Sequence, residues 1–269
     1  PIFAKTWFPS FRADRIGELL EKKKKITIED VRAMQTDSLH KSARFLVDRI
    51  KDYSFRSPEA SFVHDRLTKW NFKANSGIAP FLFYRFRHYL TEHIFKDNIK
   101  DEQHRDLIST SWTYKIMDYP RGHIDEAEFA YWVDDLTTAE KEDFKEMVRR
   151  GLIDTHKEYS ERAKKESPEW QKLLTLTYRH PMGSFPILKS FLDRGPYTVQ
   201  GGKDCIMINS FREDGRFAVD HLSTFRMIID FSDFSNSLLV NSSGQSGHFL
   251  SPYYDDQIEL YVNRKYRKM

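Results

Sequence analysis

Serine is the side chain in this sequence that comes nearest to a recognisable catalytic motif. Ser246 lies in the run Gly244-Gln245-Ser246-Gly247. A serine nucleophile on a strand-to-helix turn needs the five-residue pattern Gly-x-Ser-x-Gly, which this run does not meet. We therefore interpret the run as a tight turn between strands and do not expect Ser246 to be a nucleophile. Pro1 carries an amine of the kind that acts as a base in some enzymes, but the segment that it opens is typical of the middle of a protein.

Metal and thiol chemistry find little support in the sequence. No His-Glu-x-x-His motif is present, and His88 and His93 are five residues apart, which does not place them on one helix face. Asp255 and Asp256 lack the frame of an EF-hand loop. Cys205 is the single cysteine, so an internal disulfide is excluded, and we expect it to be a buried apolar residue. We expect no metal or cofactor site built from this chain.

The charge and hydropathy patterns predict neither a nucleic-acid nor a membrane partner. Among 269 residues, 43 are Lys or Arg and 40 are Asp or Glu, so the net charge is +3, and the two signs are interspersed. The basic run Lys22-Lys23-Lys24-Lys25 is typical of a solvated helix end, where cations suit the negative end of the helix dipole. The longest apolar run, Ile78 to Tyr84, is much shorter than the roughly 18 residues that a membrane helix needs.

The hydrophobic pattern changes period along the chain. Residues 12–180 are predicted to be mainly helical, and residues 196–263 are predicted to form strands and turns. Thr27 with Asp30 three residues later predicts a capped helix start, and Pro58 in a Ser-Pro-Glu run predicts another. Further helices are expected over residues 78–95, 124–134 and 138–150, and after a second Ser-Pro-Glu run at residues 167–169.

Three short apolar runs are predicted to be strands, over residues 204–209, 224–231 and 237–241. They are nearly continuous in apolar residues, which is typical of strands that are buried on both faces. We therefore expect the three strands to pair in one buried sheet system.

One predicted helix is interrupted by polar residues. Gln35, Thr36, Asp37, Ser38 and His40 put polar groups on all sides of the chain there. Either this turn faces solvent, or it is a buried and hydrogen-bonded polar patch.

Four stretches, in order and well spaced, resemble the β-chain of the penicillin acylase family of N-terminal-nucleophile hydrolases. Phe11–Leu20 resembles the family's Arg-x-x-Arg-Ile-x-x-Leu-Leu helix, and Thr27–Asp30 with Gln35–Asp37 resembles its Thr-x-Glu-Asp and Gln-x-Asp pattern. The second and third stretches are Leu67–Asn71 and His180–Gly202, where the family has Trp-Asp and then His-Pro-Leu, Gly-Pro and Gly-Gly.

The fourth stretch is the most specific. Phe225–Asp230, Gly244–Gly247 and Ser251–Gln257 resemble the family's Arg-x-x-x-Asp, Gly-Gln-Ser-Gly and Ser-Pro-His-Tyr-x-Asp-Gln. Two residues depart from the family pattern: Tyr253 stands where the family has His, and Asn71 stands where it has Asp. Together the four stretches cover nearly the whole chain.

The resemblance implies an α+β fold that is part of a four-layer αββα sandwich, with a helical first two thirds followed by core strands. It implies a mainly helical region over residues 1–190 and a strand-rich region over residues 191–269, which form one structural unit with the remainder of the enzyme. The expected partners are the remaining part of the β-chain, the α-chain of the same precursor and a small N-acyl substrate. The polar turn at Gln35, Asp37 and Ser38 is then expected to be a buried, structural network.

The chemistry that the resemblance implies starts outside this chain. In the family, a chain cut exposes an N-terminal serine whose hydroxyl attacks an amide carbonyl, with its own α-amine as base and an Asn side chain in the oxyanion hole. An α-amine with a pKa near 8 suits that role. None of these groups maps here. A supporting arginine does map, and we place it on Arg12, with Arg15 as the alternative register. A cation at a helix start opposes the helix dipole, so Arg12 needs a compensating role.

Two functions from different classes follow. The leading one is hydrolysis of the amide of an acylated amine, penicillin-like or other, by an enzyme of which this chain is a part and without which the chain is inactive. The alternative is a family-fold module for assembly or binding that has lost catalysis. A basic helical nucleic-acid binder is a third hypothesis, and the balanced charge argues against it. The ligands of the structural calcium found in the family do not map here, and the compartment is open, although family members are commonly periplasmic or secreted.

Overall fold

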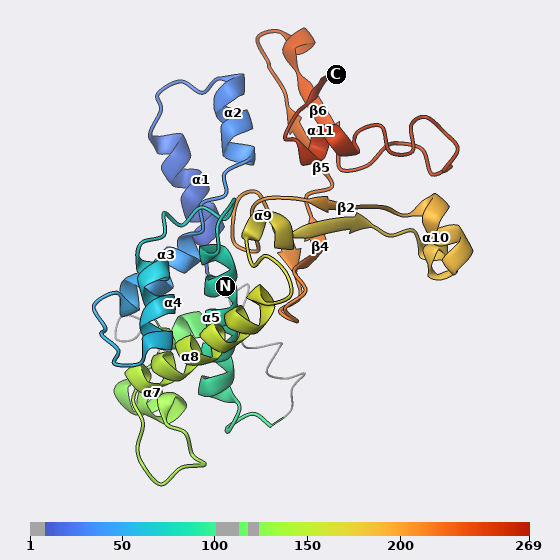
Figure 1. Ribbon diagram of the computed structural model, residues 1–269. Coiled ribbons are helices and arrows are strands. Elements are labelled where there is room, and N and C mark those ends of the chain that lie inside the picture. The colour runs from blue at the N-terminus through green and yellow to red at the C-terminus, as the bar shows by residue number, and fades with distance from the viewer. Residues whose placement is uncertain (1–8, 101–112, 118–123) are drawn as a thin grey trace, which may run out of the picture. The chain divides into compact units, whose positions relative to one another are not determined.

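The computed structural model describes residues 9–100, 113–117 and 124–269 (Figure 1). The chain divides into two compact units, each described by itself. The helical unit takes Pro1–Phe11, Lys41–Phe72 and Ile78–Pro168. The strand unit takes Arg12–His40, Lys73–Gly77 and Glu169–Met269. The two units alternate along the sequence, and the expected division at residue 190 stays a prediction.

The helical unit consists of helices with local start signals. Ser57 caps α4 through its side chain, which accepts from the amide of Ala60, and Asp143 caps α8 in the same way with the amide of Glu146. Residues 113–117 are also helical. The bounds are α3 Lys41–Ile50, α4 Pro58–Thr68, α5 Ala79–Phe95, α7 Glu126–Val133 and α8 Phe144–Ala163.

Helix α5 forms the core of the helical unit, as its aromatic sequence predicts. Phe81, Phe83 and Phe86 are fully buried, and α5 packs along α8. Gly151 in α8 allows this close approach, because a Cβ atom there would lie 3.2 Å from the backbone nitrogen of Leu90 and 3.4 Å from a ring carbon of Phe86. The expected buried helix over residues 78–95 is confirmed.

The strand unit begins with two helices. Helix α1 covers Phe11–Glu21 and α2 covers Ile28–Gln35. The capping box predicted for α2 is confirmed: the amide of Asp30 donates to the Thr27 hydroxyl at 3.2 Å, and the amide of Thr27 donates to the Asp30 carboxylate at 3.0 Å. The short helices further along are α9 Trp170–Leu173, α10 Pro186–Leu192 and α11 Ile258–Val262.

The strands of this unit form two sheets. One has four strands in the order β2-β1-β4-β3, with β1 and β4 parallel and the other neighbours antiparallel. The other has three antiparallel strands in the order β5-β6-β7. Their bounds are β1 Thr175–Tyr178, β2 Arg194–Thr198, β3 Asn209–Phe211, β4 Ala218–Leu222, β5 Phe225–Ile228, β6 Leu238–Asn241 and β7 Arg267–Lys268.

The strand predictions are corrected in two respects. Residues 204–208 form a turn rather than a strand, and β3 begins only at Asn209. The three predicted strands also lie in two sheets, because β3 pairs with β4 while β5 pairs with β6. In β5 only alternate residues are buried, so Phe225 and Met227 are exposed and the strand is covered on one face. Cys205 is fully buried, as expected.

The helix predicted over residues 138–150 is also corrected. Helix α8 begins at Phe144, and residues 134–143 form a connection that its ion pairs hold in place. Arg150 contacts Asp135 at 2.9 Å and Glu142 at 2.6 Å. Side-chain pairing therefore competes with continuation of the helix towards its N-terminus. Within the described ranges no helix is long and apolar enough to cross a membrane.

We predict that Gly151→Leu destabilises the complete protein, because the new side chain has to enter the contact between α8 and the backbone of α5. Overpacking of a close helix contact costs roughly 1–3 kcal/mol. Thermal denaturation followed by circular dichroism measures the change, with Gly17→Leu as control, since a Cβ atom at Gly17 meets nothing within 4 Å. Equal melting temperatures for the two variants would show that the α5–α8 contact tolerates a side chain.

Candidate functional site

The two arginines of α1 have different surroundings. Arg12 lies in the first turn, its side chain is exposed, and it makes no hydrogen bond or ion pair with any described residue. Arg15 lies one turn later and donates to both carboxylate oxygens of Asp37, at 2.8 and 3.4 Å, and to Glu18 at 3.2 Å. The hydrogen bonds to Asp37 raise the pKa of Arg15. Arg15 therefore fastens α1 to the turn after α2, whereas Arg12 is available for another contact.

The turn that follows α2 is hydrogen-bonded, as one alternative expects, but it is only partly removed from solvent. Its side chains are half-buried. The backbone carbonyl of Asp37 accepts from the amide of Met207 at 3.0 Å, and the carbonyl of Ser38 accepts from the amide of Ala74 at 2.9 Å and from the Cys205 thiol at 3.3 Å. The polar residues that interrupt the helical pattern thus join three separate parts of the strand unit.

A second group of motif residues surrounds the guanidinium of Arg226 in β5. Arg226 is buried between the rings of Tyr261 and Tyr266, whose centroids lie 4.3 and 5.3 Å from its Cζ atom, and it donates to the carbonyl of Tyr261. Burial lowers the pKa of Arg226. Gln35 completes the group, because its amide donates to the carbonyl of Met227 at 3.0 Å and accepts from the Tyr266 hydroxyl at 2.7 Å.

The Gly-Gln-Ser-Gly run is a hydrogen-bonded bend between β6 and α11, and the predicted tight turn between two strands is wrong in that respect. The amides of Gly244 and Ser246 donate to the carbonyls of Tyr254 and Tyr253 at 3.1 and 3.0 Å. The Ser246 hydroxyl accepts from the amide of His248 at 3.1 Å. Among the described residues, no carboxylate or imidazole nitrogen is hydrogen-bonded to this hydroxyl. The arrangement supplies a structural bend and, within the described residues, lacks the base that a serine nucleophile needs.

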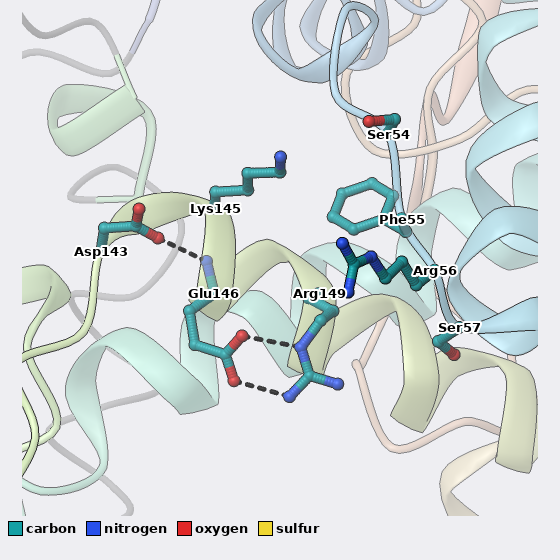
Figure 2. Close-up of a pocket in the computed structure, with 8 residues that line it drawn as sticks. All are labelled: Ser54, Phe55, Arg56, Ser57, Asp143, Lys145, Glu146 and Arg149. Atoms are coloured by element: carbon teal, nitrogen blue, oxygen red, sulfur yellow. Dashed lines mark hydrogen bonds and ion pairs between the residues drawn. The ribbon is translucent and has the colours of Figure 1, made fainter.

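The helical unit holds a cavity that no sequence signal indicates (Figure 2). It has a volume of about 300 Å³ and lies between the loop of residues 54–57 and the first turns of α8. Figure 2 shows how its acids are engaged: Asp143 accepts from the amide of Glu146 at 2.8 Å, and Glu146 holds Arg149 through two hydrogen bonds of 2.7 Å. The lining offers cations and an aromatic wall, and its Ser57 hydroxyl, which caps α4, donates to the Glu59 carboxylate at 2.5 Å.

A more open groove lies in the strand unit, between residues 26–31 and the end of β5. Its volume is about 700 Å³, and its lining is mostly apolar. The side chain of Phe231 at its edge is 82% exposed. Across the part of the chain that the structure describes, no group of three or more His, Cys, Asp or Glu residues is arranged to hold a metal ion.

Comparisons with known proteins agree on one relationship. The model of the family described as penicillin amidase matches residues 1–269. The chain is 24% identical over 295 residues to the acyl-homoserine lactone acylase QuiP of Pseudomonas aeruginosa, covering 97% of this chain and 34% of that protein. It is 26% identical over 218 residues to the protein of the same name from Pseudomonas fluorescens, covering 77% of this chain and 25% of that protein.

The fold has a match among solved structures. The thermostable penicillin G acylase from Alcaligenes faecalis aligns with a TM-score of 0.55 and 12% identity, over 98% of this chain and 50% of that chain. The expected α+β fold of the penicillin acylase type is thereby confirmed. The chain spans about a third or less of the length of these curated relatives.

We predict that Arg15→Ala lowers the stability of the complete protein, because it leaves the half-buried Asp37 carboxylate without its cation. Loss of a charged hydrogen-bond partner at such a site costs roughly 1–3 kcal/mol. Arg12→Ala on the same helix is the matched control and should change stability by less than about 0.5 kcal/mol. Chemical denaturation of the two variants and the parent protein measures both. A loss for Arg12→Ala as large as that for Arg15→Ala would contradict this division of roles.

Proposed function

Because this chain belongs to the penicillin amidase family, we propose that it is part of an enzyme that cleaves the amide bond of an acylated amine. The observation that carries the proposal is the match of the family over residues 1–269, joined to a structure in which the motif residues form the two networks around Asp37 and Arg226. Acylase relatives support hydrolysis of acyl substrates as the class of reaction.

The proposed reaction uses a nucleophile that precedes this chain in the complete protein. A terminal serine hydroxyl attacks the amide carbonyl while its own α-amine accepts the proton, and the amine product leaves with a proton to give an ester on the enzyme. Water then attacks the ester and releases the carboxylic acid. We place Arg12 beside the oxyanion donor and the terminal amine, where a planar set of N–H donors would orient the first and keep the second unprotonated.

The proposed partners are the remaining part of the same β-chain and the α-chain of the precursor. Two observations support them: the alignments leave most of each curated relative outside this chain, and the strand unit has an exposed apolar surface. Phe225, Met227, Ile229 and Phe231 are all exposed at and beyond β5, beside the groove at residues 26–31. Apolar patches of this kind mark surfaces that another segment covers.

The first test is kinetic and uses the complete enzyme. Arg12→Ala should process normally and lower kcat with a smaller change in KM. The loss should not exceed the roughly 10²–10³-fold that removal of an oxyanion donor itself causes. Arg12→Lys should restore part of the rate, because an ammonium lacks the planar fork of a guanidinium. Steady-state rates on a chromogenic phenylacetyl anilide, with processing checked by gel, decide the matter. If Arg12→Ala leaves kcat unchanged and Arg15→Ala lowers it strongly, the supporting role belongs to Arg15.

The second test uses the 269-residue chain alone. It should show no amidase activity, because the nucleophile, its base and the oxyanion donor are all supplied from outside it. The purified chain is assayed on the same anilide, with Ser246→Ala as the matched variant. Turnover that survives repurification and disappears in Ser246→Ala would overturn both the proposed reaction and the structural role given to Ser246. The alternative, a family-fold assembly module, predicts a complete protein that is equally inactive and has no Ser, Thr or Cys at a processing junction.

A further inference from the structure

The guanidinium of Arg226 has a buried donor, at Nε, that no described residue accepts. Arg226 is 7% exposed, and its Nε atom is buried without a hydrogen-bond partner. No acidic side chain pairs with it within the described ranges: the neighbouring charged and polar groups that interact with it are Tyr178, Tyr261, Tyr266 and Arg264. A buried donor that stays unsatisfied carries a large desolvation cost, so a native structure supplies it with an acceptor.

A complementary orphan lies on another strand. Asn209 in β3 is 2% exposed, and its Oδ1 atom is buried without a donor. Its Nδ2 atom donates to the carbonyl of Gln200 at 2.6 Å, which fixes which end of the amide is the oxygen. The free position at Asn209 is therefore an acceptor, opposite in character to the free position at Arg226.

Both residues line the same small cavity. Its volume is about 10 Å³, and its wall also contains Gln35, Ser223 and Tyr261. The amide of Gln35 bonds Met227 and Tyr266, and the carbonyl of Ser223 accepts from the Tyr261 hydroxyl at 2.6 Å. The buried side-chain atoms of the wall that lack a partner are one donor and one acceptor, beside a space that suits a single water, which needs roughly 10–15 Å³.

We propose that this cavity is a binding site for one structural water, which accepts from Arg226 Nε–H, donates to Asn209 Oδ1, and so links β3 of the four-stranded sheet to β5 of the three-stranded sheet. A carboxylate or phosphate is too large for the volume, and any anion would face the Asn209 oxygen. A cation would face the guanidinium. Water offers a donor and an acceptor at once and is small enough for this volume.

Crystallography of the complete enzyme at atomic resolution tests the site directly. We expect one electron-density peak about 2.7–3.2 Å from both Arg226 Nε and Asn209 Oδ1. A second crystal is soaked in bromide, whose anomalous signal separates a halide from a water. A peak without anomalous signal supports the proposal. The lack of a peak, or a bromide signal at the site, overturns it.

Substitutions at the two residues give a second, independent test of the water bridge. Asn209→Leu and Arg226→Met should each raise the unfolding equilibrium constant by roughly 5- to 150-fold, because each removes one end of the bridge and leaves the buried water short of a partner. The double variant should lose less than the product of the two factors, since either change already breaks the bridge. Asn241→Leu, on β6 and outside the cavity wall, is the matched control. Fully multiplicative losses would show that the two groups share no bridging ligand, and if a variant fails to fold, the crystallographic result decides.

Discussion

The turn at Asp37 and Ser38 is the contact on which the strand unit depends. This unit is assembled from pieces that are far apart in the sequence, and the turn holds three of them: Arg15 through the carboxylate, Met207 and Ala74 through backbone carbonyls. Each contact closes a long loop of the chain. The conformational entropy lost on closing a loop grows only slowly with the length of the loop. A few well-satisfied polar groups in a half-buried place can therefore fix the arrangement of α1, the segment 73–77 and the approach to β3.

The features that could be predicted from the sequence are those that depend on interactions between nearby residues. The start of α2 depends on Thr27 and Asp30, and the burial of α5 follows from its aromatic content, so both could be predicted from nearby residues. The strand prediction for residues 204–209 was wrong because a turn, and not a strand, buries these apolar residues. Cys205 is buried, and its thiol and the amide of Met207 donate hydrogen bonds to carbonyls in the turn after α2. Tertiary hydrogen bonding there outweighs strand propensity.

In the candidate site, too, the sequence indicated some residues, and only the structure showed what surrounds them. The motif resemblance led to two arginines on α1, and the geometry then gave them different surroundings, since only Arg15 meets Asp37. Resemblance also pointed to Arg226, but nothing in the sequence indicates that tyrosine rings, rather than a carboxylate, would lie beside its guanidinium. The cavity beside α8 had no signal at all, because its two walls lie about ninety residues apart and meet only in the fold.

Strand β5 has a consequence for the order of events when such a protein matures. It is an outer strand of its sheet, with Phe225 and Met227 exposed on one face. An outer strand with an apolar face is a template for pairing with other copies of itself. A covering segment in the same polypeptide reaches it at an effective concentration on the order of millimolar, far above that of free copies in a cell. Under the proposed function a chain cut matures the enzyme, and folding against the tethered segments then has to come before that cut. A chain that is released before this folding would self-associate through β5.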